Sequence, residues 1–126
     1  MNELFNGVMR AVSSLLGLAM VAMILAMLVG SSVAVPAADP QELKLVIENN
    51  RFSPEELKVK ANAPFVIAVT NKDKKAEEFE SKELKIEKVV PPGQTGKVRV
   101  RALKPGTYNF VGDYNQATAK GRIVAE

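Results

Sequence analysis

The chain has 126 residues, 17 of them basic and 14 acidic, with no Cys, no His and no Trp, and its formal net charge is +3. The length suits one small domain. The missing residue types exclude disulfides, zinc fingers, haem ligation by His, serine–histidine triads and blue copper centres, which need a thiolate and imidazoles. Any chemistry must therefore use carboxylates, Lys, Tyr, hydroxyl groups or the backbone.

The N-terminal quarter of the chain carries only two charges. A single Arg before a long apolar run, and small residues after it, are typical of a secretory signal cleaved after Ala37 or Ala38. The uncharged run, residues 11–30, is also long enough to form an uncleaved apolar helix that anchors the chain in a membrane. The sequence therefore predicts that residues 1–38 are a signal peptide or an N-terminal membrane anchor. Residues 39–126 are then an exported, periplasmic domain, held at the inner membrane if the segment is uncleaved.

The exported part has the pattern of short strands separated by turns. Alternating or continuous apolar runs predict strands at residues 41–48, 57–60, 64–70, 84–87, 97–102, 108–110 and 121–126. Turn signals such as Pro91–Pro92–Gly93 and Pro105–Gly106 fall between them. Seven short strands at this spacing indicate an all-β domain, either a sandwich or a barrel.

The predicted core consists of the side chains on the inward faces of these strands, together with Phe52 and Phe79 from the segments between them. They are Leu45, Ile47, Phe52, Leu57, Val59, Phe65, Ile67, Val69, Phe79, Leu84, Ile86, Val98, Val100, Tyr108, Phe110 and Ile123. Residues 74–82, KKAEEFESK, are the exception to the strand pattern. This segment is too charged for a core strand, so a helical turn or a loop packed by Phe79 is predicted there.

From Phe52 onward the sequence resembles the cupredoxin-like domain family, and more narrowly the periplasmic type that occurs with iron-uptake components. The resemblance covers about residues 43–126. It rests on the motifs FSPEELKVKANAPF, NKD, PPGQT, ALKPGTYNFVG and TAKGRIV. It implies a Greek-key β-sandwich.

The resemblance also implies where a copper ion would bind in this family. Two loops supply the ligands, and on this sequence the first His falls at Glu77 or Glu78 and the Cys at Gly112. The second His falls at Asn115, and the Met near Ala119. All four positions depart from the copper pattern, so the resemblance implies a sandwich that lacks the type 1 copper ligands and excludes blue-copper electron transfer.

Carboxylates occupy these two loops instead: Glu77, Glu78, Glu80 and Asp113. If the loops meet, the carboxylates raise one another's pKa unless a cation lies among them. Oxygen ligands suit iron, manganese or calcium. The iron-uptake type is similar in its acidic EEFE loop, although many of its members have a His at the position of Asn115. The sequence therefore predicts a metal site at these four residues, for an iron or copper ion bound by carboxylates.

A different interpretation of the acidic segment stays open. Lys and Glu are interspersed in residues 74–83, so the carboxylates could simply pair with Lys74, Lys75 and Lys82 on a solvated loop. Tyr114 has two interpretations as well, because it could cap the corner by packing or offer its hydroxyl to a bound ion.

Two functions are compatible with these observations. The first is an accessory in periplasmic metal handling or uptake, which presents iron or copper to a membrane metal permease or another periplasmic uptake component. The alternative is a metal-free protein-interaction module on a cupredoxin scaffold. An enzyme is not expected, since the chain has no imidazole and no base beside its serines. Nucleic acid is not an expected partner, membrane contact is expected only through an uncleaved N-terminal segment, and a Lys-rich edge strand predicts a monomer.

Overall fold

The computed structural model describes residues 30–126. Residues Ala38–Glu126 form one compact unit, while residues 30–37 are exposed and have no regular secondary structure. The predicted apolar helix, a signal or anchor in residues 11–30, falls almost wholly within residues 1–29. That part of the prediction therefore lies outside the described residues. Within residues 30–126 there is no helix with the length and apolar character needed to cross a membrane.

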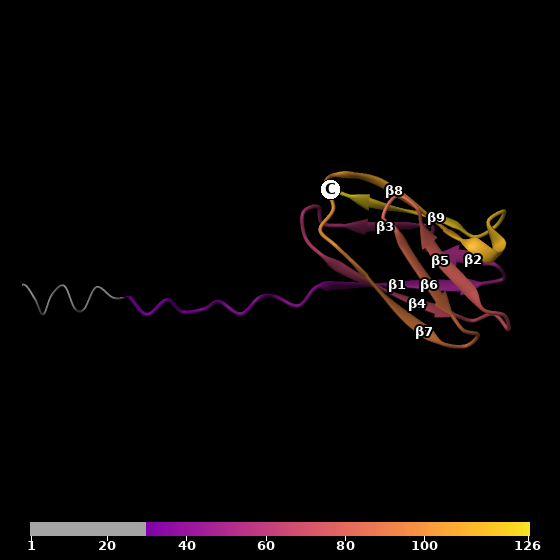
Figure 1. Ribbon diagram of the computed structural model, residues 1–126, viewed down its shortest axis with the longest axis horizontal. Coiled ribbons are helices and arrows are strands. Elements are labelled where there is room, and N and C mark those ends of the chain that lie inside the picture. Colours follow the sequence, from indigo (N-terminus) through magenta and orange to yellow (C-terminus); the bar gives the residue numbers. More distant parts are fainter. Residues whose placement is uncertain (1–29) are drawn as a thin grey trace, which may run out of the picture. The chain divides into compact units, whose positions relative to one another are not determined.

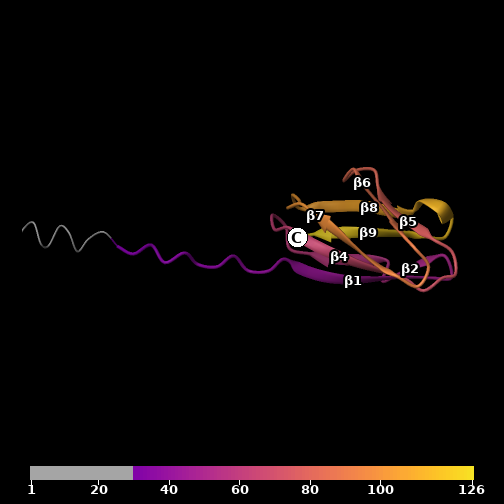
Figure 2. The same cartoon turned by 60° about the horizontal axis from the view of Figure 1, so that its bottom comes forward.

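The compact unit is a β-sandwich of two mixed sheets (Figure 1). The four-stranded sheet has the order β2-β1-β4-β7, and the five-stranded sheet has the order β3-β9-β8-β5-β6. Figure 2 shows β8 and β9 in one layer and β1 and β4 in the other. The elements are β1 Gln41–Glu48, β2 Arg51–Ser53, β3 Glu56–Val59, β4 Phe65–Asn71, β5 Glu77–Ser81, β6 Ile86–Val90, β7 Thr95–Val100, β8 Gly106–Gly112, the 3-10 turn η1 Asp113–Asn115 and β9 Lys120–Ala125.

The sandwich confirms the all-β prediction, and it settles the choice between sandwich and barrel. Each sheet contains one parallel pair, β1–β4 in the four-stranded sheet and β3–β9 in the five-stranded sheet. The other pairs are antiparallel. The strand predicted at residues 84–87 begins two residues before the observed strand β6. Leu84 and Lys85 belong to a turn, in which Lys85 has a φ of 57°, and β6 starts at Ile86.

The prediction of a loop or helical turn over residues 74–82 was wrong, because residues 77–81 form β5. This strand lies between β8 and β6 within its sheet. Its charge does not prevent this placement, since the buried polar groups find partners. Ser81 donates its hydroxyl to the carbonyl of Asn109 at 2.8 Å, and the Glu77 carboxylate accepts hydrogen bonds described below.

The core lies between the two sheets and largely matches the predicted set. Ile86 and Tyr108 are only half-buried, while the rest of the predicted side chains are buried. Three buried aromatic rings, from β2, β5 and β8, pack against one another in the core. The centroid of Phe110 lies 5.0 Å from that of Phe79 and 5.1 Å from that of Phe52, and Phe52 and Phe79 are 6.2 Å apart. These rings support the strands that carry the acidic residues.

Candidate metal site

Two neighbouring strands carry the acidic residues to one end of the sandwich. β5 pairs with β8 through Phe79 opposite Gly112, and Asp113 follows Gly112 directly as the first residue of η1. Because successive side chains of a strand point to opposite faces, Glu78 and Glu80 point away from the core on either side of the inward-facing Phe79. The pairing therefore brings the start of η1 next to the outer face of β5.

Three of the predicted residues come together there. One carboxylate oxygen from each of Glu78, Glu80 and Asp113 lies within 4.8 Å of the others. Glu80 is 8% exposed, and it lines surface depressions of about 470 and 240 Å³. Gln116 donates its amide to Asp113 Oδ1 at 2.6 Å and so orients that carboxylate. We call Glu78, Glu80 and Asp113 the acidic triad.

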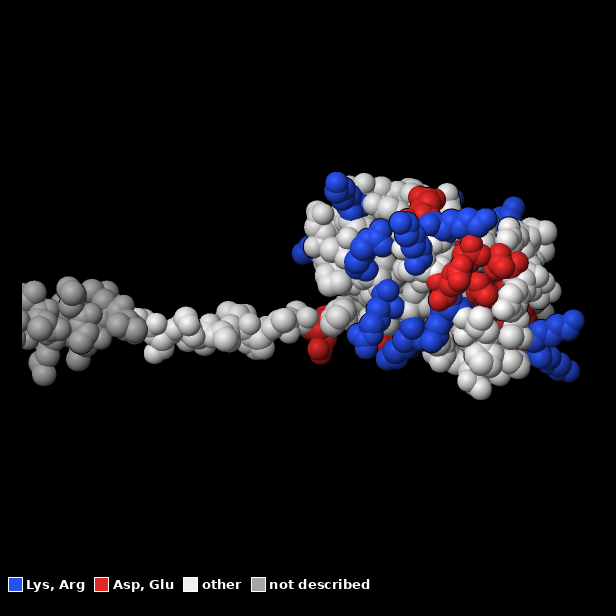
Figure 3. All heavy atoms as spheres, in the orientation of Figure 1, with Lys and Arg blue, Asp and Glu red and all other residues white. Residues whose placement is uncertain are grey.

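The electrostatics of the acidic triad favour an added positive charge. A hydrogen bond shared with Asp113, partial burial and the negative charge of Asp113 raise the pKa of the Glu80 carboxyl above its ordinary value, while Lys82 opposes this effect. Glu80 therefore binds a proton more readily than an ordinary Glu carboxyl does. A bound cation would replace that proton and remove the repulsion. Figure 3 shows acidic side chains gathered over β5 and β6, with Lys and Arg side chains on the adjoining surface.

The raised pKa of Glu80 predicts how stability depends on pH. Since the folded protein holds the Glu80 proton more tightly than the unfolded chain does, the stability from this group is complete below its ordinary pKa of 4.5 and is lost as pH rises through the raised pKa. Glu80→Gln should remove this part of the pH dependence. The measurement is the melting temperature of the metal-free chain at a series of pH values, with the exposed Glu48→Gln as control. Identical slopes for the wild type and Glu80→Gln would contradict the prediction.

Glu77 lies apart from the acidic triad and faces the interior. It is 2% exposed, and all its contacts are internal. Its Oε1 accepts hydrogen bonds from the backbone N–H of Glu78 at 2.9 Å and of Tyr114 at 3.0 Å. Its Oε2 accepts a hydrogen bond from the side-chain amide of Asn115 at 2.7 Å. The sequence could not separate Glu77 from its neighbours, because a loop over residues 77–81 gives them no fixed faces.

The positions to which the family resemblance assigns the copper ligands lie together. The Gly112 N–H donates to the carbonyl of Ala119 at 2.9 Å, and a Cβ built on Gly112 would lie 2.7 Å from both the Glu77 Cδ and the Ala119 Cβ. Asn115 contacts the same Glu77 carboxylate. This donor set does not fit a type 1 copper ion, because it supplies no thiolate and no imidazole, and the carboxylate already accepts three hydrogen bonds within the protein.

Tyr114 lies at the rim of the acidic triad. It is 53% exposed, so it does not cap the corner by packing. Partial desolvation, a hydrogen bond with Glu78 and the nearby negative charges raise the pKa of its phenol. The phenol is therefore protonated at neutral pH and lies beside a member of the triad.

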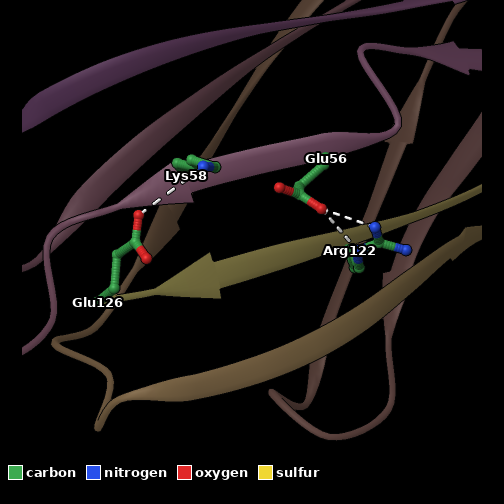
Figure 4. Close-up of polar contacts among 4 residues, drawn as sticks. All are labelled: Glu56, Lys58, Arg122 and Glu126. Carbon is green, nitrogen blue, oxygen red and sulfur yellow. Dashed lines mark hydrogen bonds and ion pairs between the residues drawn. The ribbon is translucent and has the colours of Figure 1, made fainter.

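The ion pairs predicted for a solvated acidic loop do not form. Within residues 30–126 the ion pairs are Lys58–Glu126, Lys97–Glu42 and Arg122–Glu56, and none includes a residue of the segment 74–82. Figure 4 shows two of them, which join β3 to β9 and its following residue. In the part of the chain that the structure describes, the carboxylates of the triad thus have no basic partner within 4.0 Å.

The sequence model of the cupredoxin-like domain family matches residues 18–125. The chain belongs to the cupredoxin-like domain family. An uncharacterized protein of Rickettsia prowazekii (strain Madrid E) is 36% identical over 83 residues, which is 66% of this chain and 66% of that protein. The chain thus matches slightly less than two thirds of this relative's length.

Several solved structures share the cupredoxin-like fold. The metal-binding domain of the Cu(I)-exporting P-type ATPase of Streptococcus pneumoniae D39, solved with Cu(I), has a TM-score of 0.61 at 14% identity, over 73% of this chain and 91% of that one. Auracyanin A, a blue copper protein of Chloroflexus aurantiacus, has a TM-score of 0.57 at 16% identity, over 70% and 100% of the chains. A chain of a heme-copper terminal oxidase dimer has a TM-score of 0.56 at 18% identity, over 93% and 96%. At these identities the likeness shows the fold alone.

Proposed function

We propose that this cupredoxin-like protein is an exported, monomeric accessory that binds a metal ion, iron or copper, at Glu78, Glu80 and Asp113. It then passes the ion to a membrane permease or another periplasmic uptake component, without catalysing a reaction. The observation that carries the proposal is the convergence of three carboxylates within 4.8 Å, with no basic partner among residues 30–126. They lie on the two segments that the resemblance to copper cupredoxins implies as ligand-bearing. Relatives of the same fold that handle copper support it.

The chemistry of the donors narrows the choice of ion. Carboxylates are hard ligands that suit ferrous, ferric, manganous or cupric ions, whereas Cu(I) prefers sulfur. The chain has no Cys, and its five Met residues all lie within the first 27 positions. The domain itself therefore offers no sulfur ligand, so oxidised copper or iron is the better match.

The geometry of the site suits transfer better than permanent storage. The acidic triad supplies three ligand atoms, from the half-buried Glu78 and Asp113 and from Glu80, which lines two surface depressions. An ion of octahedral preference bound there would keep other positions for water or for the ligands of a partner. An acceptor could therefore approach the ion without first unfolding the site.

Calorimetric titration of the full-length chain with ferrous, cupric and manganous ions tests the proposal. We expect saturable binding of at least one ion, and the triple variant E78Q/E80Q/D113N should weaken it more than about tenfold because the ligand charge is lost. The matched control is D39N/E48Q/E55Q, which removes one Asp and two Glu carboxylates that are exposed and lie away from the triad. It should bind like the wild type. Binding that survives in E78Q/E80Q/D113N would place the ion at another site.

The second candidate function is a metal-free interaction module. Glu77 and Asn115 favour it, because hydrogen bonds within the protein occupy the positions aligned with two copper ligands. This candidate predicts no heat with any of the three ions. The same titration therefore separates the two functions.

A further inference from the structure

We propose that Glu77 is a positioning residue, whose buried carboxylate fastens η1 to β5 and thereby holds Asp113 beside Glu78 and Glu80. The proposal rests on the metal-binding function proposed above. It assigns a role to a buried acidic side chain that the acidic triad itself does not use.

A single oxygen atom links the two segments that carry the triad. Glu77 Oε1 accepts hydrogen bonds from the N–H of Glu78, at 2.9 Å, and from the N–H of Tyr114, at 3.0 Å. One of these amides belongs to a triad residue, and the other directly follows Asp113. Because both amides are bound to the same atom, the separation between the backbones of Glu78 and Asp113 is fixed.

The second carboxylate oxygen extends the connection along η1. Glu77 Oε2 accepts a hydrogen bond at 2.7 Å from the side-chain amide of Asn115, the last residue of the turn. The turn needs such support, since it has three residues and Gly112 offers no side-chain cap. The carboxylate thus holds the turn through two successive residues.

Close packing leaves no room for Glu77 to turn outward and act as a fourth ligand. Glu77 is 2% exposed and all its hydrogen bonds are internal. The carboxyl carbon would lie 2.7 Å from a Cβ placed on Gly112, so this glycine is needed for the carboxylate to fit. The resemblance to copper cupredoxins implies that an ion joins these same two segments there, and here a carboxylate with three hydrogen bonds joins them.

The test exchanges the carboxylate at position 77 and the amide at position 115. The double variant E77Q/N115D keeps the wild-type net charge. In N115D, two carboxylates face each other and the link from Oε2 is lost. In E77Q/N115D, the amide introduced at position 77 keeps its oxygen for the two backbone N–H groups and donates its Nε2 hydrogen to the carboxylate introduced at position 115. The connection is therefore restored. A third variant, E77Q, should retain the link, because the Asn115 amide can turn its oxygen toward the new amide.

Three readouts on the full-length chain separate positioning from simple loss of structure. Manganous ion should bind N115D about tenfold or more weakly than the wild type, and E77Q/N115D should recover to within about threefold. The Tyr114 amide should exchange faster with solvent in N115D only, while the Val69 amide in the core stays protected in every variant. In metal-free protein, nuclear Overhauser contacts between the Asp113 and Glu80 side chains should be present in the wild type and the double variant and lost in N115D.

The outcomes distinguish this role from the proposed function. If the wild type binds no manganese, iron or copper, the metal function fails, and the exchange and Overhauser measurements still decide whether Glu77 positions Asp113. If N115D keeps the Overhauser contacts and the slow Tyr114 exchange, Glu77 does not position the turn. If the double variant stays as impaired as N115D in all three readouts, the link through Glu77 is not the cause, and the proposal is overturned.

Discussion

Phe110→Ala is expected to lower the free energy of unfolding by about 3–5 kcal/mol, because it removes a large ring from the centre of the core. The residue is 2% exposed, and its ring lies 5.0 and 5.1 Å from those of Phe79 and Phe52. A small domain has about 5–15 kcal/mol of stability in total, so the variant should be near its unfolding threshold at physiological temperature. Urea unfolding followed by circular dichroism measures the loss.

Tyr114→Ala is the matched control for this aromatic truncation. The ring is 53% exposed, and exposed substitutions usually change stability by less than about 0.5 kcal/mol. A difference of less than about 1 kcal/mol between the two variants would show that the three rings are not a packing centre of the core. Metal binding in Phe110→Ala should fall together with stability, because Phe110 supports the strand that ends at Gly112.

Gly112→Ala should destabilise the protein by about 1–3 kcal/mol, the usual cost of forcing an extra carbon into a filled core. The new Cβ would lie 2.7 Å from the carboxyl carbon of Glu77 and from the Cβ of Ala119. Neither neighbour can move freely, since the carboxylate is held by three hydrogen bonds and Ala119 is fully buried. Thermal unfolding of the metal-free chain measures the effect.

Gly96→Ala is the control, because it adds the same methyl group where there is room to adjust. Its Cβ would lie 3.2 Å from the flexible end of the Lys88 side chain and from a methyl of Val90. We expect a clearly smaller loss of stability there. Equal losses at the two positions would mean that the contact with Glu77 is unimportant.

The close approach of a Cβ at position 112 to Glu77 also predicts that Gly112→Cys, which introduces only the Cys of the copper pattern, destabilises the fold.

The fold could be predicted because the inward and outward faces of most strands differ strongly in polarity. In β7, Val98 and Val100 are buried and Lys97 and Arg99 are exposed, as their alternation indicates. β5 departs from this rule. Its inward positions include Glu77, which is satisfied by donors 37 and 38 residues away in the chain. A local pattern contains no trace of such distant partners, so the sequence predicts a loop where the structure has a strand.

The same error explains which part of the candidate site the sequence could define. Four carboxylates are predicted to converge, and the structure brings together Glu78, Glu80 and Asp113 but places Glu77 on the other face. In a loop, adjacent residues can face one ligand, whereas in a strand Glu77 and Glu78 must point to opposite sides. The alternating faces of a strand thus separate the buried Glu77 from the candidate ligands Glu78 and Glu80.

The parallel pairing of β3 with β9 has a consequence for the order in which the molecule can form. Leu57 lies opposite Ile123, so strands 66 positions apart along the chain must meet before the larger sheet is complete. Such distant pairings make folding slow, because much of the chain must be ordered before they form. A nascent chain that ends before β9 would leave β3 and β8 with unpaired edges. The domain should therefore reach its native state only after synthesis of its last strand, and a chaperone that shields open edges would have its greatest effect before that moment.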